Sequence, residues 1–262
     1  MNRLEPLRKV VDDALDKMDG VIALRKTSGL VAPYLFRDKE ELDELTISPK
    51  YPTPAILRLI QTAHPEAKLG IVCRGCEERG LIEMAKRNQI DLERIRVIGL
   101  ACTAEEAEEC RCAKPYPSVL IDTHVGVRTE PVVNKLTEEL RQKDMAERLE
   151  FWRSQFDKCI KCYGCRNACP QCFCPECTLE NDLWVDAGKV PPPFPTFYLI
   201  RAMHTAGKCV GCRECELACP AHIPLTTLYT LIREEVGEMF GYEPGVDLEA
   251  QPPLVLPMEV ES

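Results

Sequence analysis

The sequence predicts an α/β domain with a small parallel sheet, followed by a second, cysteine-rich domain. In residues 1–150, short apolar runs alternate with segments of helical periodicity. Residues 151–262 differ in composition, because they hold eleven of the sixteen cysteines and the proline-rich run PPPFP at 191–195. A chain of 262 residues is long enough for two modest domains.

The α/β prediction rests on alternation along the first domain. Residues 4–18 carry apolar side chains at three- and four-residue steps, which predicts an amphipathic helix. The apolar runs are expected as buried strands at 69–73, 95–102 and 118–122, and the intervening segments as helices at 55–64 and 77–89. Strand–helix–strand units of this length form right-handed parallel connections.

Five cysteines fall near the carboxyl ends of these strands. Cys73, Cys76 and Cys102 end or follow strands, and Cys110 and Cys112 lie in the next loop. Ligands of parallel sheets gather at this edge, so three or four of these thiols are predicted to form a metal site, holding a cluster or zinc. The alternative is that a thiol such as Cys73 acts as a small buried hydrophobe.

The turn after the first of these strands is a candidate anion site. Arg74, Gly75 and Glu77 open the following helix, whose N-terminus can hold an anion or a flavin phosphate. The segment RGCEERG has no established phosphate-loop form.

The second domain is expected to begin after one long helix at 131–157. Further helices are expected at 197–207 and 223–241. The predicted division is an α/β domain at 1–150, a ferredoxin-like domain at 151–241 with a cysteine-rich insertion at 172–208, and an extended tail at 242–262. The proline-rich tail is suited to lie on a partner subunit.

Eight cysteines form two copies of the run C-x2-C-x2-C-x3-C-P. The copies are Cys159, Cys162, Cys165 and Cys169, then Cys209, Cys212, Cys215 and Cys219. This is the bacterial ferredoxin spacing, in which the fourth cysteine ligates the other cluster. We therefore expect an α+β dicluster fold with two [4Fe–4S] clusters, Cys169 serving the second run and Cys219 the first. A zinc ribbon is the alternative, although zinc needs only two C-x2-C pairs.

Three more cysteines follow the first run at once. Cys172, Cys174 and Cys177 form C-x-C-x2-C, a spacing that can present three thiolates to one metal. We expect an additional cluster here, with a fourth ligand from elsewhere, so that the chain holds three or four [4Fe–4S] clusters in all. Structural zinc or free thiols are the alternatives.

Composition limits the compartment and the partners. The first twenty residues have no secretory pattern, and no run approaches the roughly 18 apolar residues of a membrane span. A cytoplasmic protein without direct membrane insertion is therefore expected. Sixteen cysteines in a reducing compartment favour metal ligands over disulfides. The net charge of −9 argues against nucleic-acid binding.

Three segments resemble a known family. LGIVCRGCEERGLIEMAKRNQIDLERIRVIGLACT at 69–103 resembles the beta-subunit family of deazaflavin-reducing hydrogenases and formate dehydrogenases. CIKCYGCRNACPQCFC and FYLIRAMHTAGKCVGCRECELACPAHIP are similar to its dicluster branch. The resemblance covers roughly 50–240. It implies an electron-relay subunit that occurs beside formate dehydrogenase, hydrogenase or heterodisulfide-reductase-type subunits in anaerobes; longer members bind FAD.

Three functional hypotheses follow. The first is a non-catalytic iron–sulfur subunit that passes single electrons between a catalytic subunit (formate dehydrogenase, hydrogenase or similar) and a second electron-transfer module. The second is an FAD-containing oxidoreductase subunit fed by its own clusters, although the sequence offers no clear isoalloxazine pocket. The third is a zinc-organised interaction protein.

Overall fold

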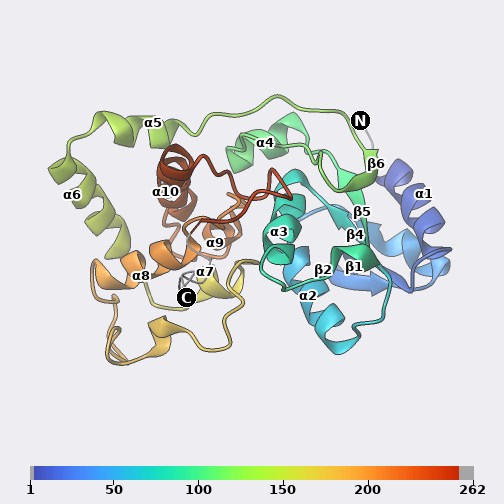
Figure 1. Ribbon diagram of the computed structural model, residues 1–262, viewed down its shortest axis with the longest axis horizontal. Coiled ribbons are helices and arrows are strands. Elements are labelled where there is room, and N and C mark those ends of the chain that lie inside the picture. Colours follow the sequence, from blue (N-terminus) through green and yellow to red (C-terminus); the bar gives the residue numbers. More distant parts are fainter. Residues whose placement is uncertain (1–2, 254–262) are drawn as a thin grey trace, which may run out of the picture. The chain divides into compact units, whose positions relative to one another are not determined.

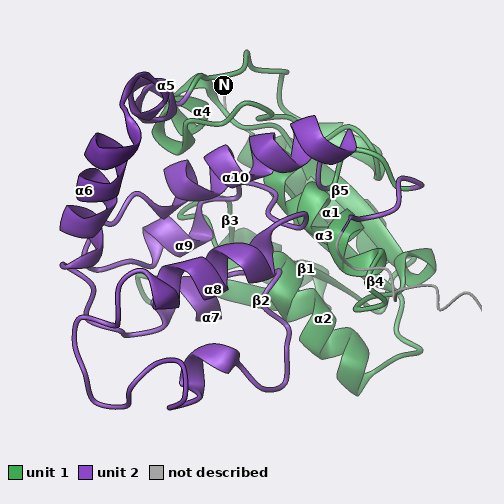
Figure 2. Ribbon diagram, turned by 60° about the vertical axis from the view of Figure 1, so that its left-hand side comes forward, with its two compact units in different colours: residues 1–133, 245–248 green, residues 134–244, 249–262 purple. Residues whose placement is uncertain are grey.

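The computed structural model describes residues 3–253, and this part of the chain forms two compact units (Figure 2). Unit 1 comprises residues 3–133 together with 245–248. Unit 2 comprises residues 134–244 and 249–253. The unit boundary thus differs from the predicted domain boundary at 150.

Unit 1 contains a mixed six-stranded sheet of order β2-β1-β4-β5-β6, with β3 also paired to β1 (Figure 1). The strands are β1 Gly20–Thr27, β2 Leu30–Phe36, β3 Leu45–Thr46, β4 Leu69–Cys73, β5 Ile95–Leu100 and β6 Ile121–Val125. Strands β1, β4, β5 and β6 pair with one another in parallel. The parallel sheet of the α/β prediction is therefore confirmed.

Strands β1, β2 and β3 were not predicted, and they add an antiparallel part to the sheet. Strands β1 and β2 form a hairpin whose two turn residues, Ser28 and Gly29, both have positive φ (53° and 81°). A type I′ turn requires this conformation at both central positions. The Ser-Gly pair between two apolar runs was the signal that could have revealed the hairpin.

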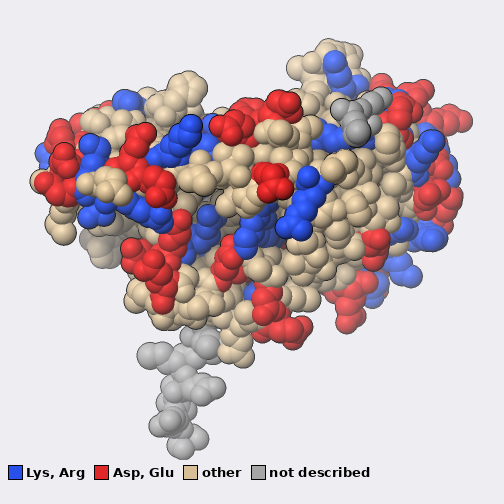
Figure 3. Space-filling view, turned by 90° about the horizontal axis from the view of Figure 1, so that it is seen from above, with Lys and Arg blue, Asp and Glu red and all other residues tan. Residues whose placement is uncertain are grey.

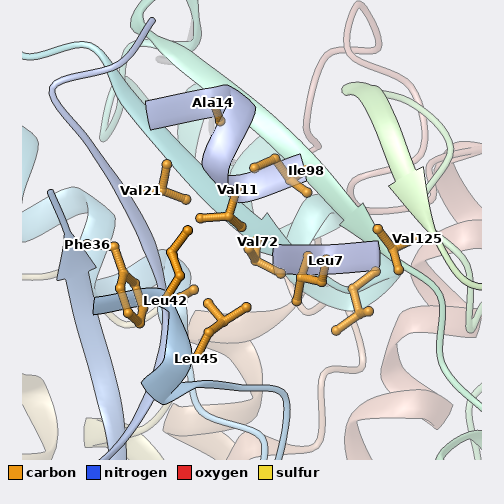
Figure 4. Packing of buried hydrophobic residues seen from close by; sticks show 12 residues of the cluster. Leu7, Val11, Ala14, Val21, Phe36, Leu42, Leu45, Val72, Ile98 and Val125 are labelled. Carbon is orange, nitrogen blue, oxygen red and sulfur yellow. The ribbon is translucent and has the colours of Figure 1, made fainter. Parts of the chain in front are cut away.

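Helices cover both faces of the sheet. They are α1 Leu4–Leu15, α2 Thr53–Ala63, α3 Gly75–Ala85 and α4 Ala104–Cys110, with short 3₁₀ segments η1 Lys39–Glu44 and η2 Leu92–Arg94. Leu7 and Val11 of α1 pack in one core with Val72 of β4 (Figure 4). Ile71, the strand neighbour of Val72, packs in the opposite core with Leu81 of α3. Successive strand residues thus supply two separate cores.

Unit 2 is built from helices and loops. Its helices are α5 Lys135–Gln142, α6 Met145–Phe156, α7 Gly164–Asn167, α8 Thr196–Thr205, α9 Glu214–Leu217 and α10 Leu225–Phe240, with a 3₁₀ turn, η3 Thr178–Glu180. The described residues of unit 2 contain no strand, so the α+β prediction is wrong there. Helices α6 and α8 precede the two cysteine runs, and stacked Phe156 and Tyr198 join them, with ring centroids 3.4 Å apart.

The single helix predicted at 131–157 is wrong, because the chain forms α5 and α6 with a break between them. Lys143 is extended, with φ −82° and ψ 147°. Asp144 then caps α6, since its Oδ1 accepts a hydrogen bond from the Glu147 amide at 2.9 Å. The Glu147 carboxylate in turn accepts from the Asp144 amide at 3.0 Å. This capping box starts a new helix.

Part of the predicted tail packs on this chain itself. The Gly245 amide donates a hydrogen bond to Glu83 Oε1 at 2.7 Å, and Gly245 contacts the backbone of Arg79 in α3. Gly245 has a φ of +74°, and a Cβ atom there would lie 2.5 Å from the Arg79 carbonyl oxygen. The segment 245–248 therefore belongs to unit 1, whereas 254–262 lie outside the described residues.

One face of the protein carries charged side chains of both signs. On the face shown in Figure 3, Lys and Arg side chains are interspersed with Asp and Glu side chains. Among residues 3–253, every helix falls short of the length and apolarity that a membrane crossing requires.

The α1 core generates a stability prediction. Leu7→Ala should lower the free energy of unfolding of unit 1 by about 3 kcal/mol, because Leu7 is fully buried and its truncation leaves a cavity. Leu30→Ala is the matched control, since Leu30 is 77% exposed. Urea unfolding measures both variants, and equal losses would contradict the packing described for α1.

Candidate metal centres

The two cysteine runs fold into the same loop. Lys161 and Tyr163 have φ angles of 55° and 58°, and the equivalent Gly211 and Arg213 have 66° and 67°. Each pair stands two and four residues after the first cysteine of its run. Left-handed residues that alternate in this way turn backbone amides toward one concave side, which favours an anionic group. The sequence repeat is thus also a repeat of backbone conformation.

Two cavities in unit 2 are each lined by four cysteines, three from one run and the fourth from the other. The first is lined by Cys159, Cys162, Cys165 and Cys219, and the second by Cys209, Cys212, Cys215 and Cys169. They contain about 440 and 380 Å³ of space free of protein atoms, part of it open to solvent. These sets are the crossed sets that the spacing predicts, while metal ligation itself stays a prediction.

The crossing depends on contact between the short helices α7 and α9. Gly164 opens α7, and a Cβ atom there would lie only 2.9 Å from the carbonyl oxygen of Ala218. Ala218 directly precedes Cys219, so the close approach places that cysteine beside the first run. In the second run the equivalent position is Glu214, where a side chain is accommodated.

Two buried hydroxyl groups test whether the second cavity suits an iron–sulfur cluster. Tyr229 and Thr226 line it, and their buried side-chain oxygens have no hydrogen-bond partner. A buried hydroxyl without a partner costs about 1–3 kcal/mol. Cluster sulfurs accept hydrogen bonds, so four thiols and two unpaired donors fit such a group. Within residues 3–253, no three His, Cys, Asp or Glu side chains converge closely enough to hold a single metal ion.

A third cavity contains the extra cysteines. Cys172, Cys174 and Cys177 line a cavity that contains about 990 Å³ of space free of protein atoms, part of it open to solvent. The pKa of Cys172 falls to about 5, because the Cys169 thiol donates a hydrogen bond to it and the Arg201 guanidinium lies beside it. A thiolate is the form that binds metal.

The third cavity is also lined by basic side chains and by one histidine, whose ring nitrogen could ligate a metal. Arg166, Arg201 and Lys208 line it, and so does His204. The sequence left the fourth ligand of the trio unassigned; His204 stands within reach of the same space.

Only some of the five cysteines in unit 1 lie close together. Cys76 and Cys112 lie close enough to Cys102 to raise its pKa, and Cys73 adjoins Cys76. Cys110 ends α4. Burial is the main cause that raises the pKa of Cys102 to about 12, and it also raises the pKa values of Cys73 and Cys76. A metal at this site must therefore displace protons.

In the predicted anion site, the groups that could bind an anion already contact other parts of the protein. The Arg74 amide donates to Glu77 Oε2 at 2.7 Å, and its guanidinium donates to the Ile47 carbonyl oxygen. Backbone atoms of Tyr116 and Lys114 cover Gly75, since a Cβ atom there would lie 2.8 and 2.9 Å from their carbonyl oxygens. These contacts favour a structural role for the turn and take up the groups offered to a flavin phosphate.

Comparison with known proteins finds homology to formate dehydrogenase beta subunits. The chain is 41% identical over 133 residues to the F420-dependent formate dehydrogenase subunit beta of Methanocaldococcus jannaschii, covering 50% of this chain and 35% of that protein. It is 40% identical over 154 residues to the F420-dependent formate dehydrogenase 1 subunit beta of Methanococcus maripaludis, covering 58% and 39%. The sequence resemblance is therefore confirmed, as distant homology over about half the chain. No protein-family model matches.

The close approach at Gly164 generates a prediction. Gly164→Ala should destabilise unit 2 by about 2 kcal/mol, because the added methyl group forces α7 away from α9. Gly237→Ala is the control, since a Cβ atom at Gly237 in α10 would lie 3.8 Å from its nearest neighbour, the Tyr242 carbonyl oxygen. Urea unfolding of both variants gives the comparison; a Gly164→Ala protein as stable as Gly237→Ala would refute the tight contact.

Proposed function

We propose that this chain is an iron–sulfur subunit that relays single electrons between the catalytic subunit of an oxidoreductase complex and a second redox module. The observation that carries the proposal is the pair of cavities, each lined by four cysteines in crossed sets. Homology to formate dehydrogenase beta subunits supports the same role. The matched stretches cover 35% and 39% of those relatives, so the identity of the complex belongs to the proposal.

Each crossed set would hold one [4Fe–4S] cluster through its four thiolates. Such clusters supply one-electron transfer at a potential set by charge, hydrogen bonds and exposure around the sulfurs. The chain's own residues provide these influences. Buried Phe197 and Tyr198 line the first cavity and limit water there, whereas Tyr229 and Thr226 present hydroxyl donors to the second.

The remaining cysteines extend the proposed relay. Cys172, Cys174 and Cys177 would hold a third cluster in the basic cavity, where Arg166, Arg201 and Lys208 offset its negative charge. The N-terminal group of Cys76, Cys102 and Cys112 would supply a further cluster site, with Cys73 adjoining it. No role follows for Cys110 from its position.

The catalytic partner is proposed from the names of the relatives. Both are formate dehydrogenase beta subunits described as F420-dependent. A catalytic subunit that oxidises formate is therefore the proposed electron donor. A module that accepts electrons from the clusters would complete the path.

Iron analysis tests the number of clusters. Anaerobically purified protein should contain about 8 iron atoms for two clusters, about 12 for three and about 16 for four. Cys172→Ser should lower the content by about four, because the third site loses a ligand. Met203→Ala, an exposed change on α8, is the control and should keep the full content. Near-zero iron with several zinc ions in the unaltered protein would overturn the proposal.

Paired substitutions test the crossed assignment. Cys162→Ser and Cys219→Ser should alter the same low-temperature EPR signal, since both residues line the first cavity. Cys212→Ser and Cys169→Ser should alter the other signal. If Cys162→Ser and Cys169→Ser affected one signal together, each run would bind its own metal and the crossed arrangement would be wrong.

A further inference from the structure

Arg201 is a buried cation at which the three cysteine-lined cavities of unit 2 meet. It lies on α8, its exposed fraction is 3%, and it lines all three cavities. Its helix presents Phe197, Tyr198 and Thr205 on the same buried face. One side chain therefore faces thiols of both ferredoxin runs and of the extra trio.

The Arg201 guanidinium is hydrogen-bonded to two of the cysteines that line the cavities. Its Nη2 donates to the Cys165 carbonyl oxygen at 2.6 Å, and its Nη1 donates to Cys172 Sγ at 3.4 Å. The guanidinium carbon lies 5.7 Å from the centroid of the Tyr229 ring. The Nε atom is buried and has no hydrogen-bond partner.

The charge of Arg201 has no carboxylate to balance it among the described residues. The ion pairs of residues 3–253 do not include Arg201, whereas Arg166, which also faces the third cavity, pairs with Glu180 at 2.7 Å. An unpaired buried charge is costly. The thiols around Arg201 become anionic when they bind metal, so bound clusters would supply the missing negative charge.

We infer that Arg201 is a shared positioning residue that raises the reduction potentials of the clusters in both crossed sites and links the third site to them. The inference rests on the proposed function, because it requires clusters in these cavities. Reduction adds one negative charge to a cluster, and a nearby guanidinium stabilises that charge. Since Arg201 is buried, its field is screened little by salt.

Potentiometric EPR measurements on three variants test this role. Arg201→Gln removes the charge but keeps a hydrogen-bond donor, and Arg201→Lys keeps the charge. Arg141→Gln is the control, because Arg141 of unit 2 pairs with Glu138 and Glu234 and lines none of the three cavities. Iron and sulfide analysis accompanies each measurement to show that the clusters are present.

Arg201→Gln should favour the oxidised form of both crossed clusters by about tenfold or more, a fall of about 59 mV in each one-electron potential. Arg201→Lys should restore most of each potential. Arg141→Gln should leave both potentials unchanged.

The outcomes separate this inference from the proposed function. Unaltered protein without iron–sulfur clusters would overturn the proposed function and the inference with it. Clusters present with unchanged potentials in Arg201→Gln would overturn only the inference. If Arg201→Gln loses iron, Arg201→Lys decides: native iron and potentials support the charge role, and iron loss there too overturns it in favour of packing alone.

Discussion

The structure of unit 2 depends on the contact between two four-residue helices. Each of the two crossed cavities takes its fourth cysteine from the other run, and the contact between α7 and α9 holds that cysteine in place. Gly164 permits the contact because its missing side chain leaves room for the Ala218 carbonyl oxygen. The surrounding helices serve this arrangement: α8 and α10 supply the buried side chains that close the cavities.

A second constraint is electrostatic, and it concerns the buried thiols and the one arginine that lies among them. The cavities gather many thiols in a buried region, and Arg201 is the cation that they share. Burial raises the pKa values of Cys165 and Cys215 in unit 2 as well as those of Cys73, Cys76 and Cys102 in unit 1. Metal binding to these thiols in either unit must therefore displace protons.

Prediction from the sequence succeeded where the signal is local. Strand β4 has the bounds predicted, 69–73, since an uninterrupted apolar run marks a strand buried on both faces. It failed where packing or capping decides. Asp144 divides one predicted helix into two, and helices stand where an α+β ferredoxin fold would place strands. The Arg74 turn shows the same limit, because only the structure reveals that Glu77 and the 114–116 backbone already occupy it.

Three features follow from the sequence alone, because they depend on short-range order along the chain: the repeated cysteine spacing, the predicted crossing of its fourth cysteines and the family resemblance. The tertiary structure decided which thiols meet. It gathers Cys76, Cys102 and Cys112, and it brings the extra trio beside Arg201. Arg201 follows Cys172 by 29 residues, with no motif to connect them. Burial and electric field depend on distances across the fold, and spacing along the chain does not specify those distances.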